Sequence, residues 1–456
     1  MKNIIVLTSV VFGLMFTSCQ KFVDVGTPTT QLVQSVVFEN DATATSAMLA
    51  IYAKMEANGI FYLMSQYSGL SSDELYNYGT NSYYIDIYTN NLTSENGVVL
   101  GLWTLLYDYN YQANAVIAGL NNSVGISAPI KSRLLGEAYF VRALCHHYLT
   151  HFFGEIPLVL STEYRQNAVL SRKAIDEVNE QIANDLNLAI NLLDEQYVSG
   201  DNTPTTTRVR PNKFAAIALL ARVELERQNW ALAEQLSTEV INETGLYALS
   251  SNLLTTFNKN NMESIWQVMP VVAGKNSFYA AYILLGAPYS VSMTDTLINS
   301  FEPGDNRRLH WVGEIVVGSQ KYYFPYKYKA RNNMPLTENT IVLRLAEQFL
   351  IRAEARAKQN NLEGANQDLN VIRARAGLSP IDITDVDEFW LAISKERKTE
   401  LFNENDFRWA DLRRMALTDE ILGPIKFPNL QPEDKLYPIP LSEINKNPNL
   451  TQNPGY

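Results

Sequence analysis

Residues 216–241 read AIALLARVELERQNWALAEQLSTEVI, and residues 347–372 read EQFLIRAEARAKQNNLEGANQDLNVI. The two stretches resemble each other at an offset of 132 residues, which pairs Ala221 with Ala353, Trp230 with Leu362, Ala233 with Ala365 and Val240 with Ile372. In both, small residues stand where two helices would cross, a short polar turn follows, and an Ala lies early in the second helix. This pattern predicts a pair of helical hairpins.

Such hairpins are typical of tetratricopeptide repeats, in which each hairpin has an apolar face that it cannot bury alone, so that several hairpins must stack. The alternative interpretation is a coincidental likeness between two amphipathic hairpins. At 456 residues the chain also exceeds the usual size of a single core, which favours two lobes or a structure built from repeats. We therefore expect a mainly α, tetratricopeptide-like scaffold of helical hairpins.

Upstream of the first hairpin, apolar residues recur at spacings of three and four, which indicates amphipathic helices. Asp41 is a candidate N-cap for the first of them, and Asn58-Gly59 ends it. Further helices are expected over 102–120, 130–151, 177–193 and 213–226. We assign residues 41–243 to an N-terminal helical part that includes an aromatic loop at 60–98, and residues 341–456 to C-terminal hairpins with a capping tail.

Between these parts, residues 244–340 have no sustained helical period. Ser264-Ile265-Trp266-Gln267-Val268 alternates as a strand does, and the stretch up to Arg331 is rich in Gly, Pro and Tyr. We expect an irregular, partly β lobe of short strands and loops, inserted between the two helical parts.

The first nineteen residues resemble an export signal that ends in a lipobox. Lys2 precedes an apolar run from Ile4 to Phe16, which is too short to span a bilayer as a helix, and Thr17-Ser18-Cys19 follows it. We expect residues 1–18 to be a lipoprotein signal peptide, Cys19 to be lipidated, and residues 19–40 to form a tether. A plain secretory signal with an incidental Cys is the alternative. In the lipoprotein interpretation, acyl chains alone attach the protein to a membrane.

Composition narrows the classes of partner. The net charge of −11 makes nucleic acid an unsuitable partner, and removal of the signal peptide takes away Lys2 and so makes the charge −12. The chain has two cysteines, Cys19 and Cys145, so no internal disulfide can form once Cys19 is acylated.

Two regions are rich in aromatic residues that alternate with Ser, Asn and Asp: residues 61–88 and residues 278–328. A pyranose ring has a patch of C–H bonds that stacks on a flat aromatic face, and its hydroxyl groups need partners that both donate and accept hydrogen bonds. The two regions therefore suit carbohydrate, although aromatic residues taken singly are more often part of a core.

Motifs for catalysis are scarce. His147 and His151 have the i, i+4 spacing that can bind zinc, but no His-Glu-x-x-His pattern surrounds them, and we predict neither a metal site nor a cofactor. Glu396, Glu400 and Glu404 repeat every four residues, which we interpret as ion pairing on a helix surface. A glycosidase pair of carboxylates is defined by its separation in space, so a helical glycoside hydrolase stays open as the least favoured alternative.

The whole chain after residue 19 resembles the SusD/RagB family, the nutrient-binding outer-membrane lipoproteins of Bacteroidetes. The resemblance includes a Gly-Asp-x-Pro turn in which this chain has Glu155 in place of Asp. The motifs are Trp103-x-x-x-Tyr107 with Asn114, Gly136-Glu137-Ala138-Tyr139-Phe140-Val141-Arg142-Ala143, Phe153-Gly154-Glu155-Ile156-Pro157-Leu158, Glu263-Ser264-Ile265-Trp266, Arg344-Leu345-Ala346-Glu347, Leu369-Asn370-x-x-Arg373-x-Arg375-Ala376-Gly377-Leu378, Glu396-Arg397-x-x-Glu400-Leu401, Arg408-Trp409-x-Asp411-Leu412-x-Arg414, Tyr437-Pro438-Ile439-Pro440 and Gln452-Asn453-Pro454-Gly455-Tyr456.

This resemblance implies binding without chemistry. Members of the family sit on the cell surface, anchored to the outer membrane, and hold an oligosaccharide or in some cases a peptide. They act as a lid over a SusC-like TonB-dependent transporter, and the resemblance implies the same location for this chain. We therefore expect no enzyme activity, with peptides or other nutrients as the alternative ligands. In the family, aromatic residues from loops near the early helices and from the irregular lobe hold the ligand, and from these regions we choose Asp73, Tyr76, Tyr78, Tyr83, Tyr84, Tyr289, Tyr322 and Tyr323.

The motif residues of the helices have a structural interpretation. Arginine and carboxylate side chains can form two-pronged contacts that fix how neighbouring helices cross. We expect a scaffold role for Trp103, Arg142, Arg397, Glu400, Arg408 and Asp411.

Overall fold

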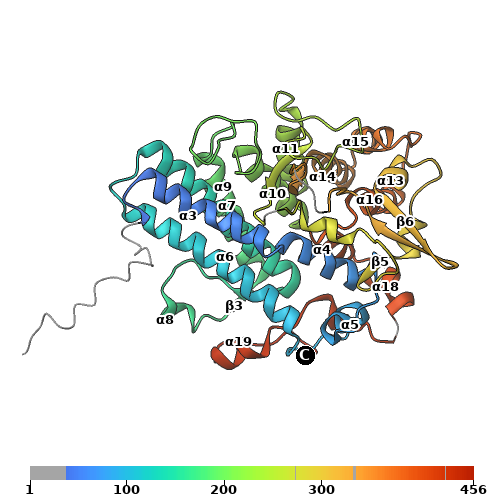
Figure 1. Cartoon of the computed structure of the whole chain (residues 1–456), viewed down its shortest axis with the longest axis horizontal. Coiled ribbons are helices and arrows are strands. Elements are labelled where there is room, and N and C mark those ends of the chain that lie inside the picture. The colour runs from blue at the N-terminus through green and yellow to red at the C-terminus, as the bar shows by residue number, and fades with distance from the viewer. Residues whose placement is uncertain (1–36, 273, 332–334, 427) are drawn as a thin grey trace, which may run out of the picture.

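The computed structural model describes residues 37–272, 274–331, 335–426 and 428–456, and its fold is mainly helical (Figure 1). The signal peptide, Cys19 and most of the expected tether lie outside the described residues. The helices of the first half are α3 (Asp41–Ala57), α4 (Ile60–Ser71), α5 (Ser82–Thr89), α6 (Gly97–Asn122), α7 (Ala128–Phe153), α8 (Tyr164–Asn167), α9 (Ile175–Leu192), α10 (Lys213–Glu226) and α11 (Trp230–Asn242). Those of the second half are α12 (Asp295–Ile298), α13 (Asn306–His310), α14 (Leu345–Lys358), α15 (Leu362–Arg375), α16 (Val386–Leu401), α17 (Phe407–Arg414), α18 (Thr418–Lys426) and α19 (Leu441–Lys446), with short 3₁₀ segments at Phe278–Tyr282 and Pro432–Lys435.

Four long helices of the first half lie side by side at one end of the molecule: α3, α6, α7 and α9 (Figure 1). Asparagine caps start two of them, because the side chain of Asn40 accepts from the backbone N–H groups of Ala42 and Thr43, and Asn96 does the same for α6. The N-cap of α3 is thus Asn40, so our assignment of Asp41 was wrong by one residue. Gly154, at φ 72°, ends α7.

The two expected hairpins are confirmed as α10–α11 and α14–α15. Each turn contains one residue in the left-handed region, Gln228 in the first hairpin and Asn360 in the second, both at φ 62° and again 132 residues apart. Ala221 and Ala353, at the two helix crossings, are both fully buried. Helix α11 packs on α14, so the hairpins stack on one another and bury the apolar faces that each would expose alone.

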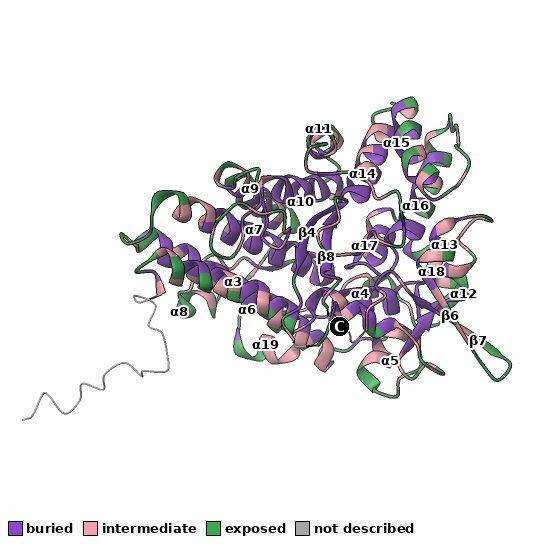
Figure 2. Cartoon of the chain, turned by 45° about the horizontal axis from the view of Figure 1, so that its top comes forward, coloured by how far each residue is buried: buried purple, intermediate pink, exposed green. Residues whose placement is uncertain are grey.

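The segment between the hairpins is irregular and partly β, as expected. The strands of the chain are β1 (Leu75–Asn77), β2 (Ile156–Pro157), β3 (Arg172–Lys173), β4 (Ser264–Val268), β5 (Val291–Met293), β6 (Val312–Val317), β7 (Gln320–Pro325) and β8 (Thr340–Arg344). They form four antiparallel pairs, β1 with β5, β2 with β3, β4 with β8, and β6 with β7. The β6–β7 hairpin projects from the body and is exposed at its tip (Figure 2).

A continuous apolar core extends through most of the described residues, and a smaller cluster lies under helices α14 to α17. Trp266 on β4 is fully buried, and its ring meets those of Tyr52, Phe61 and Phe140 at centroid distances of 5.0–6.0 Å. This strand therefore joins the irregular lobe to the core of the helical half. Within the described residues, no helix has both the length and the apolar character that crossing a bilayer requires.

Candidate functional site

The two aromatic regions meet through the β1–β5 pair. Tyr76 lies opposite Ser292, and the backbone N–H of Tyr78 donates to the carbonyl of Ser290 at 2.7 Å, which extends the ladder by one residue. Successive side chains on a strand point to opposite faces. Leu75 and its partner Met293 are buried, so Tyr76 and Tyr78 lie on the outer face of this small sheet.

Tyr78 also contacts the projecting β6–β7 hairpin. The ring of Tyr78 lies edge to face with that of Tyr322, at a centroid distance of 5.9 Å. The hydroxyl of Ser292 donates to the hydroxyl of Tyr78 at 3.4 Å. The side chain of Tyr78 remains 41% exposed. Residues that are more than 200 positions apart in the sequence thus form one exposed aromatic surface.

A pocket of about 340 Å³ lies next to this surface. It is lined by Tyr62 of α4, by residues of the loop 281–291, and by Arg331. Tyr289, on that loop, is 77% exposed. The volume is at the lower end of the range for small-ligand sites. We define the tyrosine site as Tyr62, Tyr78, Tyr289 and Tyr322 together with this pocket.

The hydroxyl group of Tyr62, which lines the pocket, stays protonated. Burial raises the pKa of Tyr62, and the neighbouring Tyr84 and Tyr289 raise it further. Burial likewise raises the pKa of Tyr76, whose hydroxyl is 3.5 Å from an Asp295 carboxylate oxygen. A protonated phenol both donates and accepts hydrogen bonds, as a sugar hydroxyl requires of its partners.

Four of the chosen tyrosines are not part of this site: Tyr76, Tyr83, Tyr84 and Tyr323. The ring of Tyr84 packs against that of Tyr67 at a centroid distance of 6.1 Å. The ring of Tyr83 lies over Gly97, where a Cβ atom would come within 2.8 Å of it. Tyr323 points to the opposite face of β7 from Tyr322, and Arg308 covers its ring at 4.7 Å. The sequence pattern did not single out Tyr62, Leu285 or Arg331, although an apolar pair such as Leu284-Leu285 before a Gly in a loop is a usable signal.

Comparisons with known proteins give the family. The profile described as "SusD family" matches residues 314–456, and the profile described as "Starch-binding associating with outer membrane" matches residues 21–225. The chain belongs to the SusD-like family. It is 24% identical to SusD-like protein P25 of Formosa agariphila, over all of this chain and 99% of that protein.

Solved structures show the same fold. A SusD superfamily protein from Bacteroides vulgatus matches with a TM-score of 0.81 at 21% identity, over 92% of this chain and all of that one. A protein described as a laminarin-binding SusD-like protein matches with a TM-score of 0.77 at 22% identity, again over 92% of this chain and all of that one.

In this SusD-like protein, Asp73 is buried instead of facing a ligand. Its carboxylate is held by Arg408, at 2.7 and 3.0 Å, and by Lys398 at 2.8 Å. Burial by itself would raise the pKa of Asp73, but Arg408 and Lys398 hold that pKa well below its ordinary value. Asp73 is therefore placed with the scaffold, and our choice of it as a ligand contact does not fit its position, because no face of the carboxylate is open to solvent.

The residues that we expected to serve the scaffold are all buried. Arg397 and Arg414 both contact Asp411, at 2.7 Å each. Arg142 grips Asp185 with two nitrogens, at 2.6 and 2.8 Å. Trp103 packs against the rings of Tyr107 and Phe153. These contacts join helices that are close in the sequence: α16 with α17, α7 with α9, and α6 with α7.

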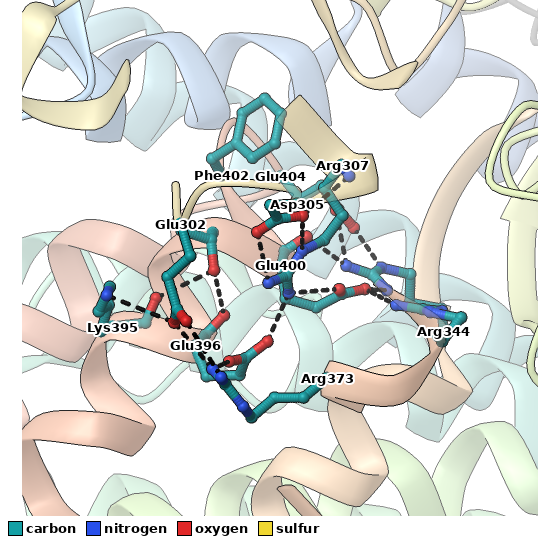
Figure 3. A network of polar contacts seen from close by, with 12 residues as sticks. Glu302, Asp305, Arg307, Arg344, Arg373, Lys395, Glu396, Glu400, Phe402 and Glu404 are labelled. Carbon is teal, nitrogen blue, oxygen red and sulfur yellow. Dashed lines mark hydrogen bonds and ion pairs between the residues drawn. The ribbon is translucent and has the colours of Figure 1, made fainter. Parts of the chain in front are cut away.

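Glu396 and Glu400 of α16 and Glu404, which follows this helix, form a buried network, not the surface ion pairs that we expected (Figure 3). Glu400 is fully buried among Arg307, Arg344 and Arg375. Although burial by itself raises the pKa of Glu400, these three guanidinium groups hold it well below the ordinary value. Glu396 and Glu404 are bound in the same way, Glu396 by Arg307 at 2.6 Å and Glu404 by Arg344 at 2.7 Å. The expectation of surface ion pairs was wrong because the arginines belong to other elements, Arg307 to α13, Arg344 to β8 and Arg375 to α15, and cover these glutamates.

A second pocket, of about 420 Å³, lies between α6 and α19 and includes Trp103 and Tyr107. Trp103 is only 4% exposed, so it offers no open ring face for stacking. Within the described chain, one group of side chains has the composition of a metal site, His147, His151 and Glu226, and it shares no residue with the tyrosine site.

Proposed function

We propose that this protein is a cell-surface, glycan-binding lipoprotein that captures an oligosaccharide at the tyrosine site. The observation that carries the proposal is the meeting of Tyr78 with Tyr322 beside a pocket that exposes Tyr289. Aromatic rings with one open face provide the apolar platform on which a pyranose stacks. Arg331 and the protonated hydroxyl group of Tyr62 supply hydrogen-bond donors at its edge.

The composition of the pocket favours binding without catalysis. Among the described residues that line it there is no Asp, Glu or His, so it lacks the pair of carboxylates by which most glycosidases work. Arg331, the charged residue of the lining, cannot lose its proton under ordinary conditions and so cannot act as a general acid or base. We infer that the ligand is bound and passed on unchanged.

The delivery step is part of the same proposal. Membership of the SusD-like family and the match to a family described as associating with the outer membrane support a place at that membrane. We propose a lipid anchor at Cys19, and a SusC-like TonB-dependent transporter as the partner that this protein covers as a lid. Copurification of a barrel transporter with the affinity-tagged protein from gently solubilised membranes of the native bacterium would support the partner, and its absence under crosslinking would contradict it.

Isothermal titration tests the binding site. The first probe is a set of laminarin oligosaccharides, because a solved structure with the same fold is described as laminarin-binding, and other plant and host glycans follow. We expect Tyr78→Ala and Tyr289→Ala each to weaken binding of the glycan that binds by five- to thirtyfold, which corresponds to about 1–2 kcal/mol of lost stacking.

Tyr164→Ala is the matched control, since Tyr164 is 70% exposed on α8 and does not belong to the tyrosine site. Equal affinities for the Tyr78→Ala variant and the unaltered protein would refute the site. Titration with a mixture of peptides that binds where glycans do not would instead favour the peptide alternative. New reducing ends after incubation with a polysaccharide would show a hydrolase.

A further inference from the structure

Two histidines and a glutamate converge at the junction of α7 and α10. His147 and His151 are one turn apart on α7, with their ring centroids 4.0 Å from each other. Glu226 is the last residue of α10, and its Oε2 atom lies 2.8 Å from Nε2 of His151 and 3.6 Å from Nδ1 of His147. One ligand atom from each residue lies within 4.8 Å of the other two.

These separations suit a cation with tetrahedral coordination. Zinc binds imidazole nitrogen and carboxylate oxygen at about 2.0–2.2 Å, so neighbouring ligand atoms in a tetrahedral site are roughly 3.4 Å apart. The distance of 3.6 Å between His147 and Glu226 already matches this value, and the distance of 2.8 Å between His151 and Glu226 needs to widen by a few tenths of an ångström. Two histidines and one glutamate are a ligand set that zinc uses where a fourth position remains open.

A further carboxylate, that of Asp406, contacts the second ring nitrogen of His151. Oδ2 of Asp406 lies 2.5 Å from Nδ1 of His151, on the side of the ring opposite to Glu226. Histidines that bind metals commonly donate their second ring N–H to a carboxylate, which fixes the ring orientation and makes the ligating nitrogen more basic. Asp406 is buried, so it can hold His151 in one orientation.

An ion pair alone explains His151 but not His147. His151 lies between the two carboxylates and needs no other partner. His147 is 1% exposed, and its Nδ1 is 3.6 Å from the carboxylate of Glu226, beyond hydrogen-bond distance. A buried polar ring in this condition is costly unless something else binds it.

The surroundings leave room for a cation. A pocket of about 410 Å³ reaches His151 and Glu226, so the fourth ligand can be water. Three arginines and one lysine lie nearby. Glu347 neutralises Arg222 at 2.6 Å, Glu354 and Asp411 neutralise Arg414, and Asp419 neutralises Lys435. Arg413 donates to the backbone carbonyl of His151. His151 gives up its ion-pair proton when its Nε2 binds a metal. Glu226 and Asp406 then carry two negative charges against the one remaining charge of Arg413, which attracts a dication.

We propose that His147, His151 and Glu226 form a binding site for one divalent transition-metal ion of the zinc class, with Asp406 as the residue that positions His151. Imidazole ligands select zinc, copper or nickel over calcium or magnesium, which prefer oxygen. The ion would join α7 to α10 and, through Asp406, to the start of α17. This proposal is independent of the glycan-binding function.

Titration of the metal-free protein with zinc chloride tests the proposal. We expect one zinc ion per chain, no heat from calcium chloride at the same concentration, and binding at least tenfold weaker in His147→Gln and in Glu226→Gln. His146→Gln and His310→Gln are the controls, because His146 is a buried neighbour on α7 and His310 is a distant histidine, and neither belongs to the group. Both should bind zinc as the unaltered protein does.

Two more measurements keep the result independent of folding. Cobalt bound to the unaltered protein should give the intense visible absorption of a tetrahedral site, and the melting temperature should rise with zinc in the unaltered protein but not in Glu226→Gln. Asp406→Asn should weaken zinc binding by 10- to 100-fold, as removal of an outer carboxylate does elsewhere. Zinc binding that is absent, or that is unchanged in a folded His147→Gln variant, overturns the proposal.

Discussion

Glu56 on α3 is a buried carboxyl group that stays protonated at neutral pH. It is 2% exposed, and the hydroxyl of Thr340 donates to it at 3.3 Å. Burial raises the pKa of Glu56 from 4.5 to about 8, although the Thr340 contact lowers it slightly. Between these two pH values the folded chain therefore binds one more proton at this residue than the unfolded chain does.

The expected consequence is a loss of stability as pH rises. The contribution of Glu56 is fully present below pH 4.5 and disappears as pH rises towards about 8. Urea unfolding at pH 5, 6, 7 and 8 should show the free energy of unfolding falling in the unaltered protein by roughly 1 kcal/mol per pH unit more than in Glu56→Gln. Parallel profiles for the two proteins would show that this carboxyl is ionised in the folded state.

The ion pair between Arg408 and Asp73 connects elements that are far apart in the sequence. Asp73 follows α4, Arg408 lies on α17 and Lys398 on α16, so one carboxylate ties the end of α4 to two helices that are more than 300 residues further along the sequence. Removing one partner of a buried ion pair leaves the other charge without compensation. This loss outweighs the attraction within the pair, because the low-dielectric interior does not solvate the remaining charge.

We expect Arg408→Ala to lower the free energy of unfolding by about 3–5 kcal/mol. Arg165→Ala, which removes an exposed arginine on α8, should change it by less than about 0.5 kcal/mol. Chemical denaturation of both variants checks the difference, and glycan titration of folded Arg408→Ala should give nearly unchanged affinity. An unaltered melting temperature together with abolished binding would contradict the scaffold role.

The helices and hairpins could be predicted because their signals are local. The bounds of α10 match the expected 213–226, and strand β4 matches 264–268, since apolar spacing and alternation are written within each segment. Glu396, Glu400 and Glu404 have the same spacing as surface ion pairs on a helix, and only the fold brings Arg307, Arg344 and Arg375 to them. Sequence spacing does not distinguish these two cases.

The candidate sites show the same limit. The two aromatic regions could be chosen from composition, but whether Tyr322 or its neighbour Tyr323 faces Tyr78 depends on the register of β7. Asp73 is of a residue type that often binds sugar hydroxyl groups, but the fold pairs it with Arg408. Glu226 could not be joined to His147 and His151 from sequence, because 75 residues separate it from the nearer one.

At the scale of the whole molecule, the tyrosine site lies at the end opposite to the start of the described chain. The start of the described chain is the end that leads to the expected anchor. The described chain begins beside α3, at the left of Figure 1, whereas β5 and β6 lie at its right end. Figure 2 gives the same arrangement from another side. An attachment at the N-terminus would therefore leave the tyrosine site directed away from the point of anchoring, where it is open to large ligands.

The anchor itself should depend on Cys19. The chain without residues 1–18 has a net charge of −12, so an anionic membrane surface would not attract it, and acyl chains would supply the attachment. We expect Cys19→Ser to move most of the protein from the membrane fraction to the supernatant of washed cells, because loss of the acylated thiol removes the buried CH₂ groups that hold it. Immunoblotting of the two fractions measures this.

Cys145→Ala is the control, since it removes the other cysteine, which is buried in α7 and out of reach of an acyl donor. This variant should stay with the membrane and should incorporate labelled palmitate, as the unaltered protein does. Membrane retention of Cys19→Ser after washing with high salt would show that the body, and not the lipid, makes the attachment. In that case a protein partner would have to hold the chain at the cell surface. The transporter should then copurify with the Cys19→Ser variant as well as it does with the unaltered protein.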